Sequence, residues 1–230
     1  MRKALREIAD PEKAPIMRAY MKSEMPYLGI QAGPFRKAAR RVLAEHRVDS
    51  FDDWRDAVLE LWRNARYREE RYSAIELAGY RKYGEFRTLD ALELYEEMIT
   101  TGAWWDLVDA LAGHRIGELL GRYPREMRPI LLGWAKCDDI WKRRSAILAQ
   151  LRFKRETDLR LLYACIRPSL DRPEFFLRKA IGWALRQYAW TDPGEVLRYV
   201  REHEARLSGL SRREALKNIA GGGFKAFTRV

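Results

Sequence analysis

Apolar residues recur at intervals of three and four along most of the chain, which is the spacing of an amphipathic helix. The pattern is clearest over Asp53–Arg63, Leu89–Ile99 and Phe175–Tyr188. Helix caps and breakers separate the periodic segments at short intervals, and no segment shows the clear alternation of a strand. We therefore predict an all-α protein with on the order of a dozen helices of about 10–16 residues.

A small residue followed by an apolar one marks a repeat along the sequence. The marker residues, spaced by 34 to 36 positions, are Ala38, Ala74, Ala110, Ala146, Ala180 and Ala215. A period of this size with two helices per unit is typical of an α-solenoid of HEAT-like repeats, in which each helix pair buries its apolar face against its neighbours. We predict about six such repeats. Because alanine is common in helices, a chance series is the alternative.

The charge balance is strongly basic, with 44 Lys and Arg against 33 Asp and Glu and a formal net charge of +11. This favours a polyanionic partner, and the alternative is charge that is simply solvated. Two positions before the marker alanines stand four arginines, which a solenoid would align as a ladder for a DNA backbone. They are Arg36, Arg144, Arg178 and Arg213.

The ladder is interrupted at its centre by Trp105, Asp106 and Asp109. Trp105 and Asp109 are one helical turn apart, or ~40° around the helix axis. An indole and a carboxylate on one face could receive a cation within a groove that otherwise suits DNA. The alternative is that Asp106 or Asp109 pairs with an arginine of a neighbouring repeat and that the two tryptophans, Trp104 and Trp105, belong to the core.

The segment that follows is the strongest candidate for phosphate contacts. Positions 139 to 155 contain one acidic residue, Asp139, and six basic residues. The basic residues are Lys142, Arg143, Arg144, Arg152, Lys154 and Arg155. Trp183 could join Trp105 across a groove or fill the interior. Trp54, Trp62 and Trp141 are expected to serve packing.

Other chemistries have little support. Cys137 and Cys165 have no paired spacing, and we expect two buried thiols. The three histidines, His46, His114 and His203, are too dispersed for a typical metal motif. The glycines at 221–223 form no phosphate-binding loop. We expect no metal and no cofactor, and the basic but polar N-terminal residues suggest an intracellular protein.

Several motifs in the same order resemble the AlkD-type DNA alkylation repair family. These are WWDLVD at 104–109, DIWKRRSAIL at 139–148 and KAIGWALRQYA at 179–189, with YMK at 20–22, YLGIQ at 27–31 and LSRREA at 210–215. The resemblance implies a right-handed-type solenoid with a concave basic face in a single domain over residues 1–220, followed by a flexible tail over 221–230. It also implies a monofunctional glycosylase that excises N3- and N7-alkylated purines from double-stranded DNA.

Transferred by position, the resemblance makes Asp109 the catalytic carboxylate, with Trp105, Trp183 and Tyr20 at the lesion and its backbone. The expected phosphate contacts are Arg144, Arg152, Lys154, Arg178, Lys179 and Arg186. Arg152 stands where the family often has lysine. We expect a monomer without membrane contact, located in the cytoplasm and associated with the nucleoid, as in a bacterium.

Two other functions stay open. One is a non-catalytic HEAT-repeat protein that binds branched or distorted DNA, and the other is a protein scaffold, which the net charge disfavours. The enzymatic interpretation requires Asp109 to reach DNA. An Asp109 side chain turned inward, paired with a guanidinium and out of reach of a duplex would leave only DNA binding.

Overall fold

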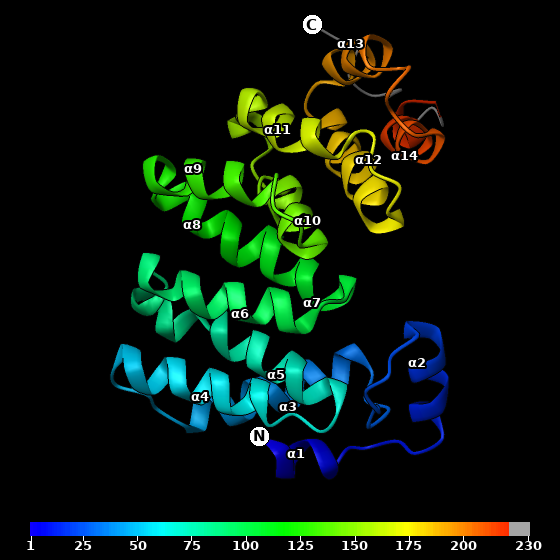
Figure 1. The fold of residues 1–230 in the computed structure, drawn as a ribbon. Coiled ribbons are helices and arrows are strands. Elements are labelled where there is room, and N and C mark those ends of the chain that lie inside the picture. The colour runs from blue at the N-terminus through cyan, green and yellow to red at the C-terminus, as the bar shows by residue number, and fades with distance from the viewer. Residues whose placement is uncertain (221–230) are drawn as a thin grey trace, which may run out of the picture. The chain divides into compact units, whose positions relative to one another are not determined.

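The computed structural model describes residues 1–220, which form fourteen α-helices joined by turns and short 3₁₀ or π-helical stretches (Figure 1). No β-strand occurs within this range, which confirms the all-α prediction. No helix of the described part has the length and apolar character needed to span a bilayer. The predicted flexible tail, 221–230, lies outside the described residues.

The chain divides into two compact units, Met1–Leu94 and Tyr95–Val230. The boundary falls within helix α6 (Leu92–Gly102). The single domain over residues 1–220 stays a prediction.

The first unit contains five complete α-helices followed by 3₁₀ turns at Arg81–Phe86 and Leu89–Ala91. The helices are α1 (Arg2–Arg6), α2 (Lys13–Met21), α3 (Ala32–Glu45), α4 (Phe51–Arg63) and α5 (Arg68–Ala78). In α4 the side chain of Ser50 accepts a hydrogen bond from the Asp53 amide at 3.1 Å, which caps the helix as its sequence predicts. Trp54, Val58 and Trp62, spaced by four, then form its buried face.

A buried carboxylate fixes the segment ahead of α3. The Glu69 side chain accepts hydrogen bonds from the backbone amides of Leu28 at 2.9 Å and Ile30 at 3.1 Å. Gly29 between them has a φ of +82°, and a Cβ there would lie 2.0 Å from the carbonyl oxygen of Asp10. Only glycine therefore permits this close approach to the chain leading into α2.

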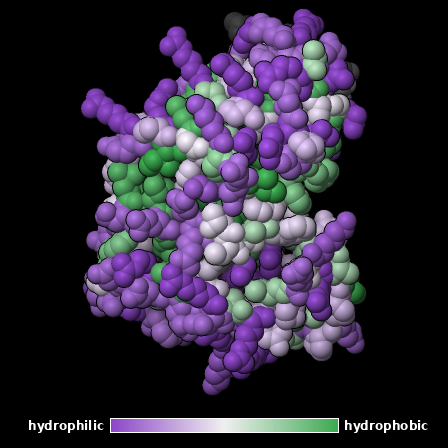
Figure 2. Space-filling view, viewed as in Figure 1, coloured by the Kyte–Doolittle hydropathy of each residue, from purple (hydrophilic) through white to green (hydrophobic). Residues whose placement is uncertain are grey.

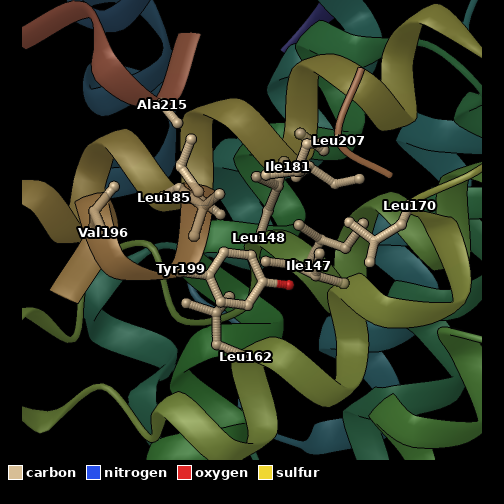
Figure 3. Packing of buried hydrophobic residues seen from close by; sticks show 14 of the residues in the cluster. Ile147, Leu148, Leu162, Leu170, Ile181, Leu185, Val196, Tyr199, Leu207 and Ala215 are labelled. Carbon is tan, nitrogen blue, oxygen red and sulfur yellow. The ribbon is translucent and has the colours of Figure 1, made fainter. Parts of the chain in front are cut away.

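The second unit contains the remaining helices and a larger core. The helices are α7 (Trp105–Ala110), α8 (Gly117–Arg122), α9 (Pro124–Trp134), α10 (Ile140–Leu148), α11 (Leu159–Ile166), α12 (Phe175–Ala189), α13 (Pro193–Glu202) and α14 (Gly209–Ala220). A π-helical stretch, Leu111–Ile116, joins α7 to α8. Figure 3 shows how Ile147, Ile181 and Tyr199, from α10, α12 and α13, pack in one apolar cluster.

The marker alanines occupy one helix each, in α3, α5, α7, α10, α12 and α14. Five of the six are buried, and Ala110 is half-buried. Within the second unit α10 packs against α7 and α12, and α12 packs against α14. In the second unit, the repeat in the sequence therefore marks helices that pack on one another.

Hydrophilic residues dominate the face shown in Figure 2, with hydrophobic residues in smaller patches. The described chain nevertheless exposes five large hydrophobic side chains, those of Ile8, Ile16, Tyr20, Phe175 and Trp190. Trp54, Trp62 and Trp141 are buried, as predicted.

Candidate functional site

A pocket of about 320 Å³ lies in the second unit, lined by residues of α7, α10 and α12. Its lining combines aromatic, acidic and basic side chains, namely Trp105, Asp109, Arg144, Phe175, Phe176, Lys179, Trp183 and Arg186. Six of these residues are ones that the sequence singles out. The structure therefore brings most of the predicted site together.

Helix α7 supplies Trp105 and Asp109. It begins directly after Trp104, whose backbone is extended. Leu107 and Val108 are fully buried and fasten α7 to the core. Because Trp105 and Asp109 are one turn apart, they share the side of the helix that lines the pocket. Both side chains are half-buried, so Trp105 is not an interior residue.

Arg144 of α10 holds the Asp109 carboxylate with two parallel hydrogen bonds. Its Nε donates to Oδ1 at 2.6 Å and its Nη2 donates to Oδ2 at 2.7 Å. Its Nη1 donates to the carbonyl oxygen of Phe176 at 2.5 Å, and the guanidinium carbon lies 6.0 Å from the centre of the Phe176 ring. The guanidinium is thus fixed on several sides, and it fixes the carboxylate in turn.

The Asp109 side chain keeps 13% of its surface exposed, against 5% for Arg144. The enzymatic interpretation of the sequence expected Asp109 to be unpaired, and its alternative expected an arginine partner. The structure shows the arginine partner. Asp109 nevertheless lines the pocket. A carboxylate offers about four lone-pair positions, and Arg144 uses two of them, so the group can accept a further hydrogen bond.

Burial raises the pKa of Asp109 above its ordinary value, and the negative charge of Asp106 acts in the same direction. The hydrogen bonds and positive charge of Arg144 oppose this rise without cancelling it. Asp109 therefore takes up a proton at a higher pH than an exposed aspartate.

Glu214 of α14 joins two of the basic residues in the pocket. Its carboxylate lies 2.8 Å from the Lys179 Nζ and 2.6 Å from the Arg186 Nη1. These partners, Lys179 foremost, hold the pKa of Glu214 below its ordinary value. A Cβ at Gly182 would lie 2.5 Å from the Cβ of Glu214, so glycine permits the close approach of α14.

The other predicted site residues lie outside this pocket. Arg178 is half-buried on α12 and donates its Nε to the carbonyl oxygen of Arg172 at 3.0 Å. Arg152 and Lys154 are exposed on the segment that follows α10. Tyr20 belongs to the first unit, where it is 80% exposed on α2.

The four arginines of the predicted ladder differ in exposure. Arg36 and Arg213 are exposed, Arg178 is half-buried and Arg144 is buried. Because Arg144 directs three nitrogens to protein acceptors, its position favours holding Asp109 over binding a phosphate. Its assignment as a phosphate contact stays a prediction.

Sequence reasoning missed three residues of the site. Phe175 and Phe176 precede Lys179 by about one helical turn, and this spacing is a signal that could have indicated them. Glu214 stands one position before a marker alanine, and only the packing of α14 on α12 reveals its partners.

Within residues 1–220, no group of three or more His, Cys, Asp or Glu side chains is arranged to hold a metal ion. Cys165 is buried as expected, and this burial raises its pKa to about 12. Cys137 is only half-buried, and its Sγ lies 3.1 Å from the carbonyl oxygen of Trp134.

Comparisons with known proteins place this pocket in context. Residues 1–219 match the family described as DNA alkylation repair enzyme. A solved structure described as a predicted DNA alkylation repair enzyme from Enterococcus faecalis is similar, with 30% sequence identity and a TM-score of 0.82. The similarity covers 92% of this chain and 97% of that one. No match was found among curated proteins.

Proposed function

Because the chain belongs to the DNA alkylation repair enzyme family, we propose that it is a DNA glycosylase for alkylated purines. The reaction hydrolyses the N-glycosidic bond of purines alkylated at N3 or N7, such as 3-methyladenine and 7-methylguanine, in duplex DNA. The observation that carries the proposal is Asp109, a carboxylate fixed by Arg144 in the wall of an aromatic and basic pocket.

The substrate explains why a carboxylate and aromatic rings belong together. Alkylation at N3 or N7 gives the purine a positive charge, which the faces of Trp105 and Trp183 attract. Lys179 and Arg186 supply positive charge for nearby phosphates. The same pocket thus offers favourable contacts to the cationic nucleoside and to its anionic backbone.

The positive charge also makes the purine a good leaving group. When the bond between C1′ and the purine nitrogen breaks, its electron pair neutralises the purine, and positive charge develops on the sugar. A carboxylate near C1′ stabilises this oxocarbenium-like transition state, as carboxylates do in glycoside hydrolysis. Water then bonds to C1′ and gives up a proton to Asp109 or to solvent.

Arg144 orients Asp109 for this role. The two hydrogen bonds fix the plane of the carboxylate before substrate binds, so no reorganisation is required during the reaction. In this account Arg144 is a positioning residue.

We propose a monofunctional enzyme in which water is the nucleophile. The amine nearest to the site is that of Lys179, which pairs with Glu214 at 2.8 Å. As an ammonium ion it has no lone pair with which to attack C1′. Borohydride trapping should therefore yield no covalent adduct with DNA, and a trapped adduct would contradict this part of the proposal.

The remaining predicted contacts complete the proposed DNA-binding surface. Arg152, Lys154 and Arg178 would bind phosphates, and Tyr20 would contact the lesion or its backbone. The proposed architecture is a HEAT-like solenoid in a single domain, acting as a monomer. The packing of α10 on α7 and of α12 on α10 and α14 supports it.

The test is incubation with duplex DNA treated with a methylating agent, followed by chromatography of the released bases. We expect 7-methylguanine and 3-methyladenine from the native protein and strongly reduced release from Asp109→Asn. Asp106→Asn is the matched control, because it removes a neighbouring acid of the same helix that does not line the pocket. No release by the native protein, or equal release by Asp109→Asn, would overturn the proposal.

One observation favours a second candidate function. The ion pair with Arg144 neutralises Asp109, so the pocket could bind distorted DNA without cleaving it. In that case the native protein binds DNA tightly and in a salt-sensitive way but releases no base.

A further inference from the structure

Trp190 is a large aromatic side chain that the proposed reaction does not use. Its residue is 55% exposed, although burial of a Trp side chain strongly favours folding. Of the five large hydrophobic residues that the described chain exposes, Phe175 and Trp190 mark the two ends of α12. Phe175 belongs to the candidate site, and Trp190 lies at the other end.

Helix α12 aligns Trp190 with the pocket. Lys179, Trp183 and Arg186 line the pocket, and Trp190 follows at the next position of the same stripe, spaced by four, three and four residues. Trp190 is the C-cap, and its φ of −66° and ψ of −19° continue the helix. At 1.5 Å per residue it lies ~10 Å beyond Trp183 along the axis, which corresponds to about three nucleotides of a DNA strand.

A basic loop lies beside Trp190. The two contribute to one hollow of about 650 Å³, which Phe153, Lys154 and Arg155 line together with Trp190. Glu156 also lines this hollow, and the exposed Arg152 adds a third positive charge just before it. The loop therefore keeps a net positive charge.

The loop is held in place by its two ends. The buried Gln150 side chain donates to the carbonyl oxygen of Asp158 at 3.0 Å and accepts from the Asp158 amide at 2.7 Å. Between these residues Lys154 has a φ of +52°, a conformation that a residue with a side chain rarely adopts. The two hydrogen bonds between Gln150 and Asp158 hold the ends of the loop together, and so keep Lys154 and Arg155 in a defined position.

We propose that Trp190, Lys154 and Arg155 form a second DNA contact, for the sugar-phosphate backbone of the duplex about three nucleotides from the lesion. The proposal rests on the proposed function for its register, because the pocket around Asp109 fixes the lesion. The two cations bind phosphates, and the Trp190 ring packs on a deoxyribose. Charge complementarity and continuity with the pocket along α12 carry the inference.

The first experiment measures binding to an undamaged 24-base-pair duplex by fluorescence anisotropy at several salt concentrations. Trp190→Ala should weaken binding roughly fivefold, and Trp190→Phe, which keeps an aromatic ring, should stay within about twofold of the native protein. The double variant Lys154→Ala/Arg155→Ala should lower the salt-dependence slope by about two. Arg125→Ala is the control for charge, because it removes an exposed arginine of α9, which lies apart from α12 in Figure 1.

The second experiment tests the register. A stable abasic analogue, tetrahydrofuran, replaces one nucleoside in duplexes with twelve base pairs on both sides or with two on one side. The loss of binding affinity caused by Trp190→Ala should disappear when the duplex is shortened on one side of the analogue. It should persist when the duplex is shortened on the other side. Equal penalties for both shortened duplexes, or undamaged-duplex binding by Trp190→Ala that equals native binding, would overturn the inference.

The two proposals fail in different ways. If the native protein releases no alkylated base but Trp190→Ala still weakens duplex binding, the glycosylase proposal fails and the second contact stands. If bases are released and Trp190→Ala binds and cleaves like the native protein, only the second contact fails. Circular dichroism of each variant confirms that it is folded.

Discussion

Two carboxylates held by hydrogen bonds, one in each unit, show how similar groups can serve different ends. Glu69 in the first unit is fully buried, and each of its oxygens accepts a hydrogen bond from a backbone amide. Asp109 in the second unit also accepts two hydrogen bonds, but both come from one arginine side chain, that of Arg144. Asp109 also lines a pocket, whereas Glu69 lies entirely within protein.

The two carboxylates differ in whether protein surrounds them completely or leaves part of the group open to a pocket. Glu69 has only protein around it, so its charge serves to hold the segment at 28–30 against α5. Asp109 keeps 13% of its side chain exposed among aromatic and basic groups. Burial alone therefore does not separate a structural carboxylate from a candidate catalytic one, and an open face beside a pocket is the more informative feature.

The largest expected effect comes from removing the partner of Asp109. Arg144→Ala removes a buried side chain and leaves the largely enclosed Asp109 carboxylate unpaired, so we expect the free energy of unfolding to fall by about 3 kcal/mol or more. Base release should be lost as well. Urea denaturation followed by Trp fluorescence measures the first effect. Arg144→Lys keeps the positive charge but lacks the planar guanidinium. Its free energy of unfolding and its rate of base release should lie between those of Arg144→Ala and the native protein.

Removing the charge of Asp109 should slow the reaction by more than it destabilises the fold. In Asp109→Asn the amide oxygen can accept from only one of the two Arg144 nitrogens that bind Asp109, and the stabilising charge near C1′ is gone. We expect single-turnover base release to slow by at least about 100-fold, close to 3 kcal/mol. Loss of DNA affinity in parallel with the rate would instead indicate a binding residue.

Glu69 should show the opposite behaviour. In Glu69→Gln the amide group can accept from only one of the two backbone amides, so we expect the unfolding free energy to fall by about 2 kcal/mol. Hydrogen exchange at Leu28 and Ile30 should accelerate. The rate of base release from bound DNA should stay unchanged, and a large loss of that rate would show that the two carboxylates are not functionally distinct.

The smallest effect concerns pH. Because burial and Asp106 raise the pKa of Asp109, base release should decline on acidification at a higher pH than expected for an ordinary aspartate. Asp106→Asn removes a like charge and lowers that pKa, so the acidic limb should move to lower pH by a fraction of a unit. If the acidic limb of the pH profile is unchanged in Asp106→Asn, the decline in base release reflects the titration of another group.

The same pKa has a consequence for stability. Between the ordinary aspartate pKa and the raised value, the folded protein binds more protons at Asp109 than the unfolded chain. This group alone therefore makes the fold more stable as pH falls through that window and less stable as pH rises.

Local spacing predicted much of the fold. The periodicity of Asp53–Arg63 indicated helix α4, in which Trp54 and Trp62 are buried as expected. In the second unit, the marker alanines indicated helices that pack on one another. The one-turn interval of Trp105 and Asp109 placed both correctly on the pocket side of α7. These features depend on helix geometry, which the order of residues determines.

Pairings between helices were harder to predict. An arginine partner for Asp109 was one of two alternatives, but spacing could not choose between them. The link from Lys179 and Arg186 to Glu214 depends on how closely α14 approaches Gly182. Such contacts depend on side-chain rotamers and helix separation, which hydrophobic periodicity does not encode.

The π-helical stretch Leu111–Ile116 couples chain length to the direction in which Asp109 points. A π-helix winds more residues into each turn than an α-helix, so six residues of it rotate the chain by roughly 100° less than six α-helical ones. Deleting one residue there would change the rotation of α7 relative to α8. Asp109 would then point away from Arg144, although no residue that lines the pocket is altered. We therefore expect deletion of one residue that does not line the pocket to abolish base release.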